Sequence, residues 1–313
     1  MRLCFALALR LALPFAVLAA PSDDPIQIAP DFVANVLADS GHEGSIGGLA
    51  AGSNRLYLLA VQRQAGPPEA TLVSTDLMGR DPRPAEVSGM LSHVAHEPGG
   101  PLVVLRAAQL VFIDPISLRE LQTGAPVPGL VSLTVAAGAV AGALYDGRVM
   151  RFSPGPPDLL FATPASEVME MPWLVVALGG SKVAAVSAAD GSIVVHDSTS
   201  GRTTKAALSG NAAAESLALC PPVQNCAAIR HAVSAGAGRM LLVPANYRRS
   251  DGLPVLEADE SGAVRASHRL RLPAREPGRR SRPVSFAFAG GHLFVGGSDG
   301  SIARYSLPVG SGR

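Results

Sequence analysis

The side chains that could do chemistry stand in three short stretches of the 313-residue sequence. In the first, His42 and Glu43 lie next to each other before the first strand-like segment, and a histidine beside a carboxylate can bind a metal ion or transfer a proton. No further ligands can be identified for this pair. His93 and His96, three residues apart on a strand, would point to opposite faces. We therefore expect neither a metal site nor a cofactor.

Four arginines crowd the second stretch, PAREPGRRSRP: Arg275, Arg279, Arg280 and Arg282. Guanidinium groups recognise carboxylates, phosphates and acidic surfaces through paired hydrogen bonds, so this stretch is a candidate for binding an anion or a partner protein. The other interpretation is a solvated connection, which is the usual role of a charged loop rich in proline and glycine. Nucleic acid is not expected as the partner, because no aromatic residues are interleaved for base stacking.

The third stretch, CPPVQNC, holds Cys220 and Cys226. An exported chain meets an oxidising environment in which such a pair closes, so we predict a disulfide between them. A metal half-site and a redox pair are the alternatives. A set of four ligands is missing, however, and the spacing is not Cys-x-x-Cys.

The first residues predict export. Arg2 and Arg10 precede an apolar run from Leu11 to Ala20, and small residues end it, which is typical of a secretory signal peptide. A membrane anchor would need about 20 uninterrupted apolar residues, and Arg10 divides this run. We predict a signal peptide over residues 1–19, a secreted or periplasmic protein, and no membrane span in the mature chain.

Composition limits the core and the partners. Aromatic residues make up only 4% of the chain, so the core must be built from Val, Leu, Ala and Ile. The formal net charge is +1, which gives no overall electrostatic reason to expect nucleic acid or an acidic surface as partner.

A repeated turn shows which elements position these stretches. Asp-Gly dipeptides separate pairs of strand-like runs at Asp146-Gly147, Asp190-Gly191, Asp251-Gly252 and Asp299-Gly300. Glycine accepts a positive φ and aspartate tolerates it, so each dipeptide predicts a hairpin with a type I′ turn. Two earlier hairpins, which turn near residues 67–70 and near Ala108, lack Asp-Gly but keep the same phase. Six hairpins therefore recur.

Each hairpin sits inside a unit of four short strands. A glycine-rich strand precedes the hairpin and a small polar turn follows it, which gives units of about 40 residues. In this layout LVFIDPISLREL and GSIVVHDSTSGR resemble the third strand and following turn of blades in the broad β-propeller group with WD40-like, YVTN-like and NHL-like repeats. The resemblance implies one all-β propeller over residues 26–308, followed by a tail over residues 309–313.

The last unit contains only three strands before the chain ends. The leftover strand-like segment DFVANVLAD, residues 31–39, can supply the fourth strand beside Ser301 to Ser306 and close the ring. We therefore predict six four-stranded blades. Seven blades, the alternative, would require another full unit between Gly191 and Asp299.

The resemblance also indicates where function lies. In propellers of this group, the loops that join an outer strand to the next inner strand share a face with the hairpin turns, and ligands usually bind there. The arginine stretch and the cysteine-containing insertion would both belong to this rim. We interpret the chain as a non-catalytic binding or scaffold module that holds a protein or an anionic ligand at the rim. The alternative is a propeller hydrolase, lactonase or dehydrogenase with its site at the mouth of the central channel, where His42 and Glu43 could act.

Overall fold

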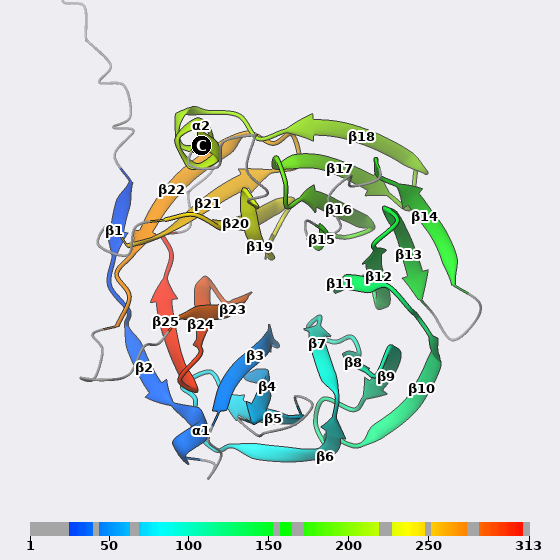
Figure 1. Cartoon of the computed structure of the whole chain (residues 1–313), viewed down its shortest axis with the longest axis vertical. Coiled ribbons are helices and arrows are strands. Elements are labelled where there is room, and N and C mark those ends of the chain that lie inside the picture. Colours follow the sequence, from blue (N-terminus) through cyan, green and yellow to red (C-terminus); the bar gives the residue numbers. More distant parts are fainter. Residues whose placement is uncertain are drawn as a thin grey trace, which may run out of the picture.

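Six sheets, each built on four antiparallel strands, form a closed ring in the computed structural model of the chain (Figure 1). The innermost strands of the six sheets surround the ring axis, and the fourth strands lie along the circumference. The structure describes residues 25–39, 44–62, 69–152, 157–164, 172–218, 227–247, 252–273 and 282–308.

Blades one to three follow one another in the sequence, each ordered from the innermost to the outermost strand. Blade one contains β3 (Gly44–Ala51), β4 (Arg55–Gln62), β5 (Ala70–Asp76) and β6 (Arg83–Gly89). Blade two contains β7 (Leu91–His96), β8 (Leu102–Arg106), β9 (Gln109–Ile113) and β10 (Glu120–Pro126). Blade three contains β11 (Leu130–Ala136), β12 (Ala139–Leu144), β13 (Arg148–Phe152) and β14 (Asp158–Ala162).

Blades four to six complete the ring. Blade four contains β15 (Trp173–Gly179), β16 (Lys182–Ser187), β17 (Ser192–Asp197) and β18 (Arg202–Ala207). Blade five contains β19 (Ile229–Gly236), β20 (Arg239–Pro244), β21 (Leu253–Asp259) and β22 (Val264–Leu270), with β1 (Ile26–Ile28) added outside. Blade six contains β23 (Pro283–Ala289), β24 (His292–Gly297) and β25 (Ser301–Ser306), and its outer strand is β2 (Phe32–Asn35). The prediction of six four-stranded blades is confirmed.

The N-terminal segment closes the ring as predicted. Strand β2 pairs antiparallel with β25, in a register that sets Phe32 opposite Arg304 and Asn35 opposite Ser301. The segment is not a strand to its end, because the next four residues form the helical turn α1 (Val36–Asp39). The Asn35 side chain accepts a hydrogen bond from the backbone N–H of Ala38 at 3.2 Å, which caps that turn.

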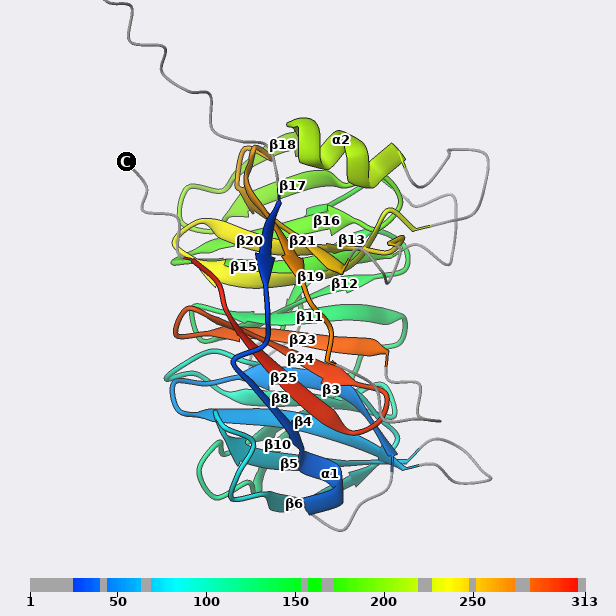
Figure 2. The same cartoon turned by 90° about the vertical axis from the view of Figure 1, so that its left-hand side faces the viewer.

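A fifth strand in blade five was not predicted. Strand β1 runs parallel to β22, with Ile26 opposite His268 and Ile28 opposite Leu270. Figure 2 shows β1 and β2 following each other along the outside of the ring, so that one segment crosses from blade five to blade six. Three residues are too short to give a hydrophobic period in the sequence, which explains why β1 escaped notice.

The predicted turn type is wrong at the Asp-Gly hairpins whose aspartate the structure describes, whereas Asp251 lies outside the described residues. The glycines have positive φ, +82° at Gly147 and +83° at Gly300, but neither Asp146 nor Asp299 does. Each aspartate instead accepts a hydrogen bond on its side chain from the backbone N–H two residues later, for example from Arg148 at 3.0 Å. This is an Asx turn followed by a left-handed glycine, so the aspartate contributes through its carboxylate.

Positive φ at two successive residues occurs at a hairpin without Asp-Gly. Ala107 and Ala108 have φ of +46° and +65° between β8 and β9. That pair of values is the requirement of a type I′ turn, and it is met here by alanine.

The core lies between neighbouring blades and is aliphatic, as the composition predicted. Between blades four and five, for example, Val186 and Ile193 pack near Leu242 and Leu256. Burying each such side chain contributes about 1.5–3 kcal/mol to the free energy of unfolding.

The predicted insertion lies between β18 and β19, and it carries a helix that was not predicted, α2 (Asn211–Ala218). Just before α2, the Ser209 backbone N–H donates to Gly262 at 3.0 Å and its carbonyl accepts from Val264 at 3.1 Å, which ties the insertion to blade five. In the parts of the chain that the structure describes, no helix has the length and apolarity needed to cross a membrane.

Candidate binding rim

One face of the ring, here called the rim, is built by a contact that recurs in five blades. The residue that leads into the innermost strand accepts a backbone hydrogen bond from the hairpin between the second and third strands of the same blade. These contacts, all 2.9–3.1 Å long, are Ala107 to Met90, Tyr145 to Gly129, Ala188 to Pro172, Ala245 to Ala228 and Ser298 to Arg282. The expectation that inter-blade loops and hairpin turns share a face is confirmed at these described flanks.

In blades one, two, three, five and six, the innermost strand carries an extra residue near the end at which it begins, on the rim. The register against the second strand skips Gly47, Ser92, Val131, Arg230 and Val284. A residue left unopposed in this way is a β-bulge, which increases the local twist and releases a side chain from the regular pleat. Four of the five are small or aliphatic, and Arg230 is the exception.

Arg282 is the one proposed site residue that falls within the described chain. It is exposed at the start of β23, where its backbone N–H donates to the Ser298 hydroxyl at 2.9 Å. The other proposed residues lie outside the described residues: His42, Glu43, Arg275, Arg279, Arg280 and the predicted disulfide partners Cys220 and Cys226.

Arg230 was missed by the sequence reasoning, although it is the exposed bulge residue of β19. Tyr247 is half-buried between blades five and six, in the hairpin that follows β20. Burial raises the pKa of the Tyr247 phenol, and the charges of Arg230 and Arg282 oppose that rise, so both guanidinium groups lie within electrostatic reach of one ring. Within the described residues, neither guanidinium has an ion pair. The recurring bulge was the signal that could have identified Arg230.

His231 follows Arg230 in the chain, and its side chain is largely buried. Its ring lies against Phe286 of blade six, with 4.6 Å between the ring centroids. Burial, together with the neighbouring charge of Arg230, lowers the pKa of His231 to about 4. The imidazole is therefore uncharged near neutral pH and adds apolar surface to this side of the rim.

His93 and His96 point to opposite faces of blade two, as predicted. The Nε2 atom of His93 lies 3.0 Å from the carbonyl of Val131 in blade three, and burial lowers the pKa of this histidine. The ring of His96 meets Tyr57 of blade one edge to face, with 4.9 Å between centroids. Both histidines are therefore inter-blade packing residues. Among the residues that the structure describes, no three His, Cys, Asp or Glu side chains are grouped so that they could hold a metal ion.

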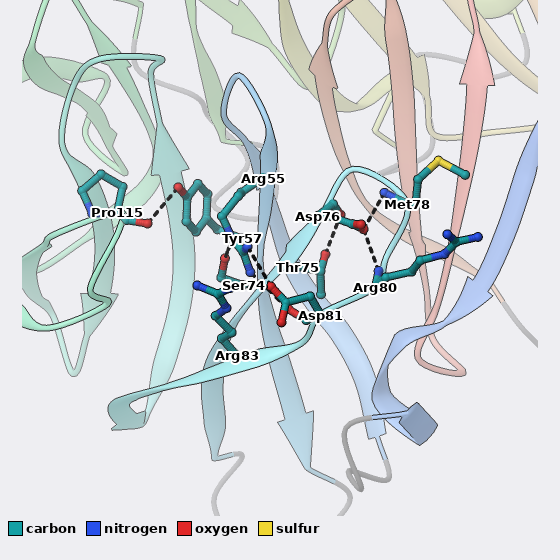
Figure 3. Close-up of polar contacts among 10 residues, drawn as sticks. All are labelled: Arg55, Tyr57, Ser74, Thr75, Asp76, Met78, Arg80, Asp81, Arg83 and Pro115. Atoms are coloured by element: carbon teal, nitrogen blue, oxygen red, sulfur yellow. Dashed lines mark hydrogen bonds and ion pairs between the residues drawn. The ribbon is translucent and has the colours of Figure 1, made fainter.

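The opposite face of the ring carries the turns between first and second strands and between third and fourth strands. Figure 3 shows its blade-one part, where the Asp81 carboxylate forms ion pairs with the guanidinium groups of Arg83, at 2.7 Å, and Arg55, at 3.3 Å. These two arginines lower the pKa of Asp81. Tyr57 donates its hydroxyl to the carbonyl of Pro115 at 3.1 Å and so ties blade one to blade two. Arg55 and Arg83 are thus engaged in contacts within the protein, unlike Arg230 and Arg282.

Comparison with known proteins bears on the fold. No protein-family model matches the chain, and no curated protein matches its sequence. Solved structures do match. The WD40 β-propeller domain of Doa1 has a TM-score of 0.51 and 12% identity, covering 86% of this chain and 95% of that one. U3-55K has a TM-score of 0.55 and 12% identity, covering 85% and 97%. The WD40 repeats of RRP9 have a TM-score of 0.54 and 11% identity, covering 86% and 96%.

At 11–12% identity these likenesses describe architecture. Together with the six blades and their ring closure, they show that the chain is a β-propeller similar in fold to WD40-repeat propellers.

Proposed function

We propose that the chain is an exported, non-catalytic binding module that holds an acidic partner protein at the rim. The observation that carries this proposal is the pair of exposed arginines, Arg230 and Arg282, which come from two blades, both lie within electrostatic reach of Tyr247, and have no acidic partner among the described residues. Export rests on the predicted signal peptide over residues 1–19.

The chemistry of this group suits a carboxylate-bearing surface. A guanidinium group presents its donors in a fixed fork that matches a carboxylate, and two such groups from neighbouring blades can receive two acidic side chains. Tyr247 offers an amphipathic ring near them, and tyrosine and arginine are enriched in the residues that dominate interface energy. The loop that contains Arg275, Arg279 and Arg280 leads directly into Arg282, so it would add charge of the same sign.

The alternative function, hydrolysis or dehydrogenation at the ring axis, has less support from the described residues. An enzyme site of that kind needs converging carboxylate, amide or imidazole groups from several blades. The bulge positions beside the axis instead hold glycine, serine, valine and one arginine.

The test compares two exposed-arginine variants of the whole mature chain. In one, Arg230 and Arg282 are changed to serine. In the control, Arg202 is changed to serine, because it is also exposed and also without an ion pair among the described residues, but it begins β18 on the opposite face. Partners are crosslinked in the exported protein fraction, identified by mass spectrometry, purified, and measured by calorimetry against each variant.

We expect an acidic partner whose affinity falls about tenfold or more in the rim variant, stays unchanged in the control, and weakens with salt. Charged hydrogen bonds of about 1.5–3 kcal/mol account for that loss, and exposed charges are screened over about 8 Å at physiological ionic strength. A partner that binds the rim variant as tightly as the parent chain would remove the proposal.

A further inference from the structure

A cleft of about 690 Å³ lies between blades four and five, on the face opposite the rim. It is bounded by the turn between β15 and β16, the turn between β19 and β20, and the turn that follows β21. Its volume falls within the range of about 300–1,000 Å³ that is usual for small-molecule sites. The charged residues that line it are Lys182, Arg239, Asp259, Glu260 and Arg265.

The floor of the cleft is backbone. The Gly238 N–H donates to the carbonyl of Leu178 at 2.7 Å, which fixes the two inner turns against each other. Gly180 and Gly238 have positive φ, and a Cβ atom at either position would meet nothing within 4 Å. The space above these glycines is therefore open to a ligand.

The Asp259 carboxylate of the cleft is saturated by its own turn. Its Oδ1 atom accepts from the Ser261 N–H at 2.9 Å, the Ser261 hydroxyl at 2.5 Å and the Ala263 N–H at 3.2 Å. Its Oδ2 atom accepts from Arg265 Nε at 2.6 Å. Asp259 thus has little capacity left for a ligand that donates hydrogen bonds.

The cationic side chains are not saturated. Lys182 donates one of its three N–H groups to the Glu260 carboxylate of the neighbouring blade, with 2.6 Å between Nζ and Oε2. Arg239 donates through Nη1 to the buried Glu257 at 2.6 Å, and its other donors have no partner among the described residues. Arg265 contacts the Asp259 carboxylate through Nε and Nη2, which leaves the Nη1 donors without a partner among the described residues. The unused hydrogen-bonding capacity of the cleft therefore belongs mostly to cationic donors.

We infer that this cleft is a second binding site, distinct from the rim, for a small anion with several acceptor oxygens, such as a phosphate or polycarboxylate group. Lys182, Arg239 and Arg265 hold its oxygens from three sides, and the backbone floor of Gly180 and Gly238 lets it approach closely. Glu260 competes for Lys182, because its carboxylate occupies the same ammonium group that the anion would bind.

The test titrates the folded full chain with pyrophosphate and, separately, with citrate. Calorimetry gives the affinity, and the amide signals of ¹⁵N-labelled glycines report the location, since Gly180 and Gly238 form the floor. Binding of either probe with shifts of these two glycines supports the site. Binding of only one probe also identifies phosphate or carboxylate as the group it prefers. No binding of either at millimolar concentration overturns the inference.

Three variants fix the mechanism through the sign of their effects. Lys182→Gln and Arg265→Gln should each weaken binding about tenfold, whereas Glu260→Gln should tighten it, because it releases Lys182 and removes a negative charge. A merely structural role for the Lys182–Glu260 pair would make the two halves of the pair act alike, and that result would overturn the inference.

The matched control is Arg83→Gln. Arg83 is 58% exposed and pairs with Asp81 in the equivalent turn of blade one, as Arg265, 63% exposed, pairs with Asp259. Its removal should leave binding unchanged. An equal loss in this control would assign the effect to overall charge and overturn the site.

Discussion

At the scale of single residues, the arginines of the ring differ in how they are engaged. Of the 26 basic residues in the sequence only Lys182 and Lys205 are lysine, so position, rather than residue type, decides what each cation does. Arg83 is held by an aspartate in a turn, and such an exposed pair contributes about 0–1 kcal/mol to stability. Arg230 has no such partner among the described residues and is exposed, because a bulge releases it from the pleat.

His231 makes folding stability depend on pH. Its pKa is lowered from 6.5 to about 4 in the folded chain, so the unfolded chain binds more protons between these values. Stability from this residue is therefore present above about pH 6.5 and is lost as the pH falls toward 4. Between pH 7 and pH 5 the loss should be about 2 kcal/mol.

Urea unfolding of the parent chain and of His231→Gln at both pH values measures the contribution of His231 to the free energy of unfolding. The variant should lose about 2 kcal/mol less than the parent between pH 7 and pH 5. Equal pH dependence in the parent and the His231 variant would show that the imidazole is not held neutral by burial.

At the scale of elements, the N-terminal segment shows why a strand pattern can be right in position and wrong in extent. Apolar residues continue through Val36 and Leu37, which made residues 31–39 look like one strand. Val36 and Leu37 are fully buried in the cluster between blades six and one, but they reach it from a helical turn. Burial was predictable from residue type. The turn depended on Asn35 as its cap, a contact that a short apolar pattern does not reveal.

Leu37 should be one of the residues on which ring closure depends. It is 1% exposed, and its Cβ lies 2.8 Å from the position a Cβ would take at Gly300, in the hairpin of blade six. Leu37→Ala should lower the free energy of unfolding by about 2–5 kcal/mol. Val33→Ala in the same segment is the matched control, because Val33 is 45% exposed and should cost about 0.5 kcal/mol or less. Denaturant unfolding that finds the two variants equally stable would contradict this account of closure.

The sequence predicted the blades from local signals, but the residues of the candidate sites depend on contacts between distant parts of the chain. Hairpin positions, blade count and closure followed from turn residues and strand-like runs, because these are local signals. Arg230 was overlooked because its exposure depends on register against β20, which is a non-local property. The cleft between blades four and five was missed for a related reason, since Lys182 and Glu260 are 78 residues apart and meet only through the ring.

At the scale of the whole molecule, closure distributes stability around the ring. Each of the six buried clusters joins residues of neighbouring blades or of blade six and the N-terminal segment, so no blade has a core of its own. The two candidate sites are also made between blades: the rim group from blades five and six, the cleft from blades four and five. A change that loosens one blade is therefore expected to disturb the neighbouring site as well.

Export and oxidation provide the last prediction, which concerns the mature molecule. Protein recovered from an oxidising compartment should lack residues 1–19, because the apolar run after Arg10 is followed by small residues that signal peptidases cleave. Its intact mass should also be lower by two hydrogens than that of the reduced chain, because Cys220 and Cys226 are bridged and Cys4 is removed with the leader. Peptide mapping without reductant locates the bond.

Changing both cysteines to serine should lower the free energy of unfolding by at most about 2 kcal/mol, because so short a loop restricts the unfolded chain only modestly. Two alkylatable thiols in the exported protein, or an intact leader, would refute the corresponding half of the prediction, and the six-bladed ring would be unaffected by either result because its described blades contain no cysteine.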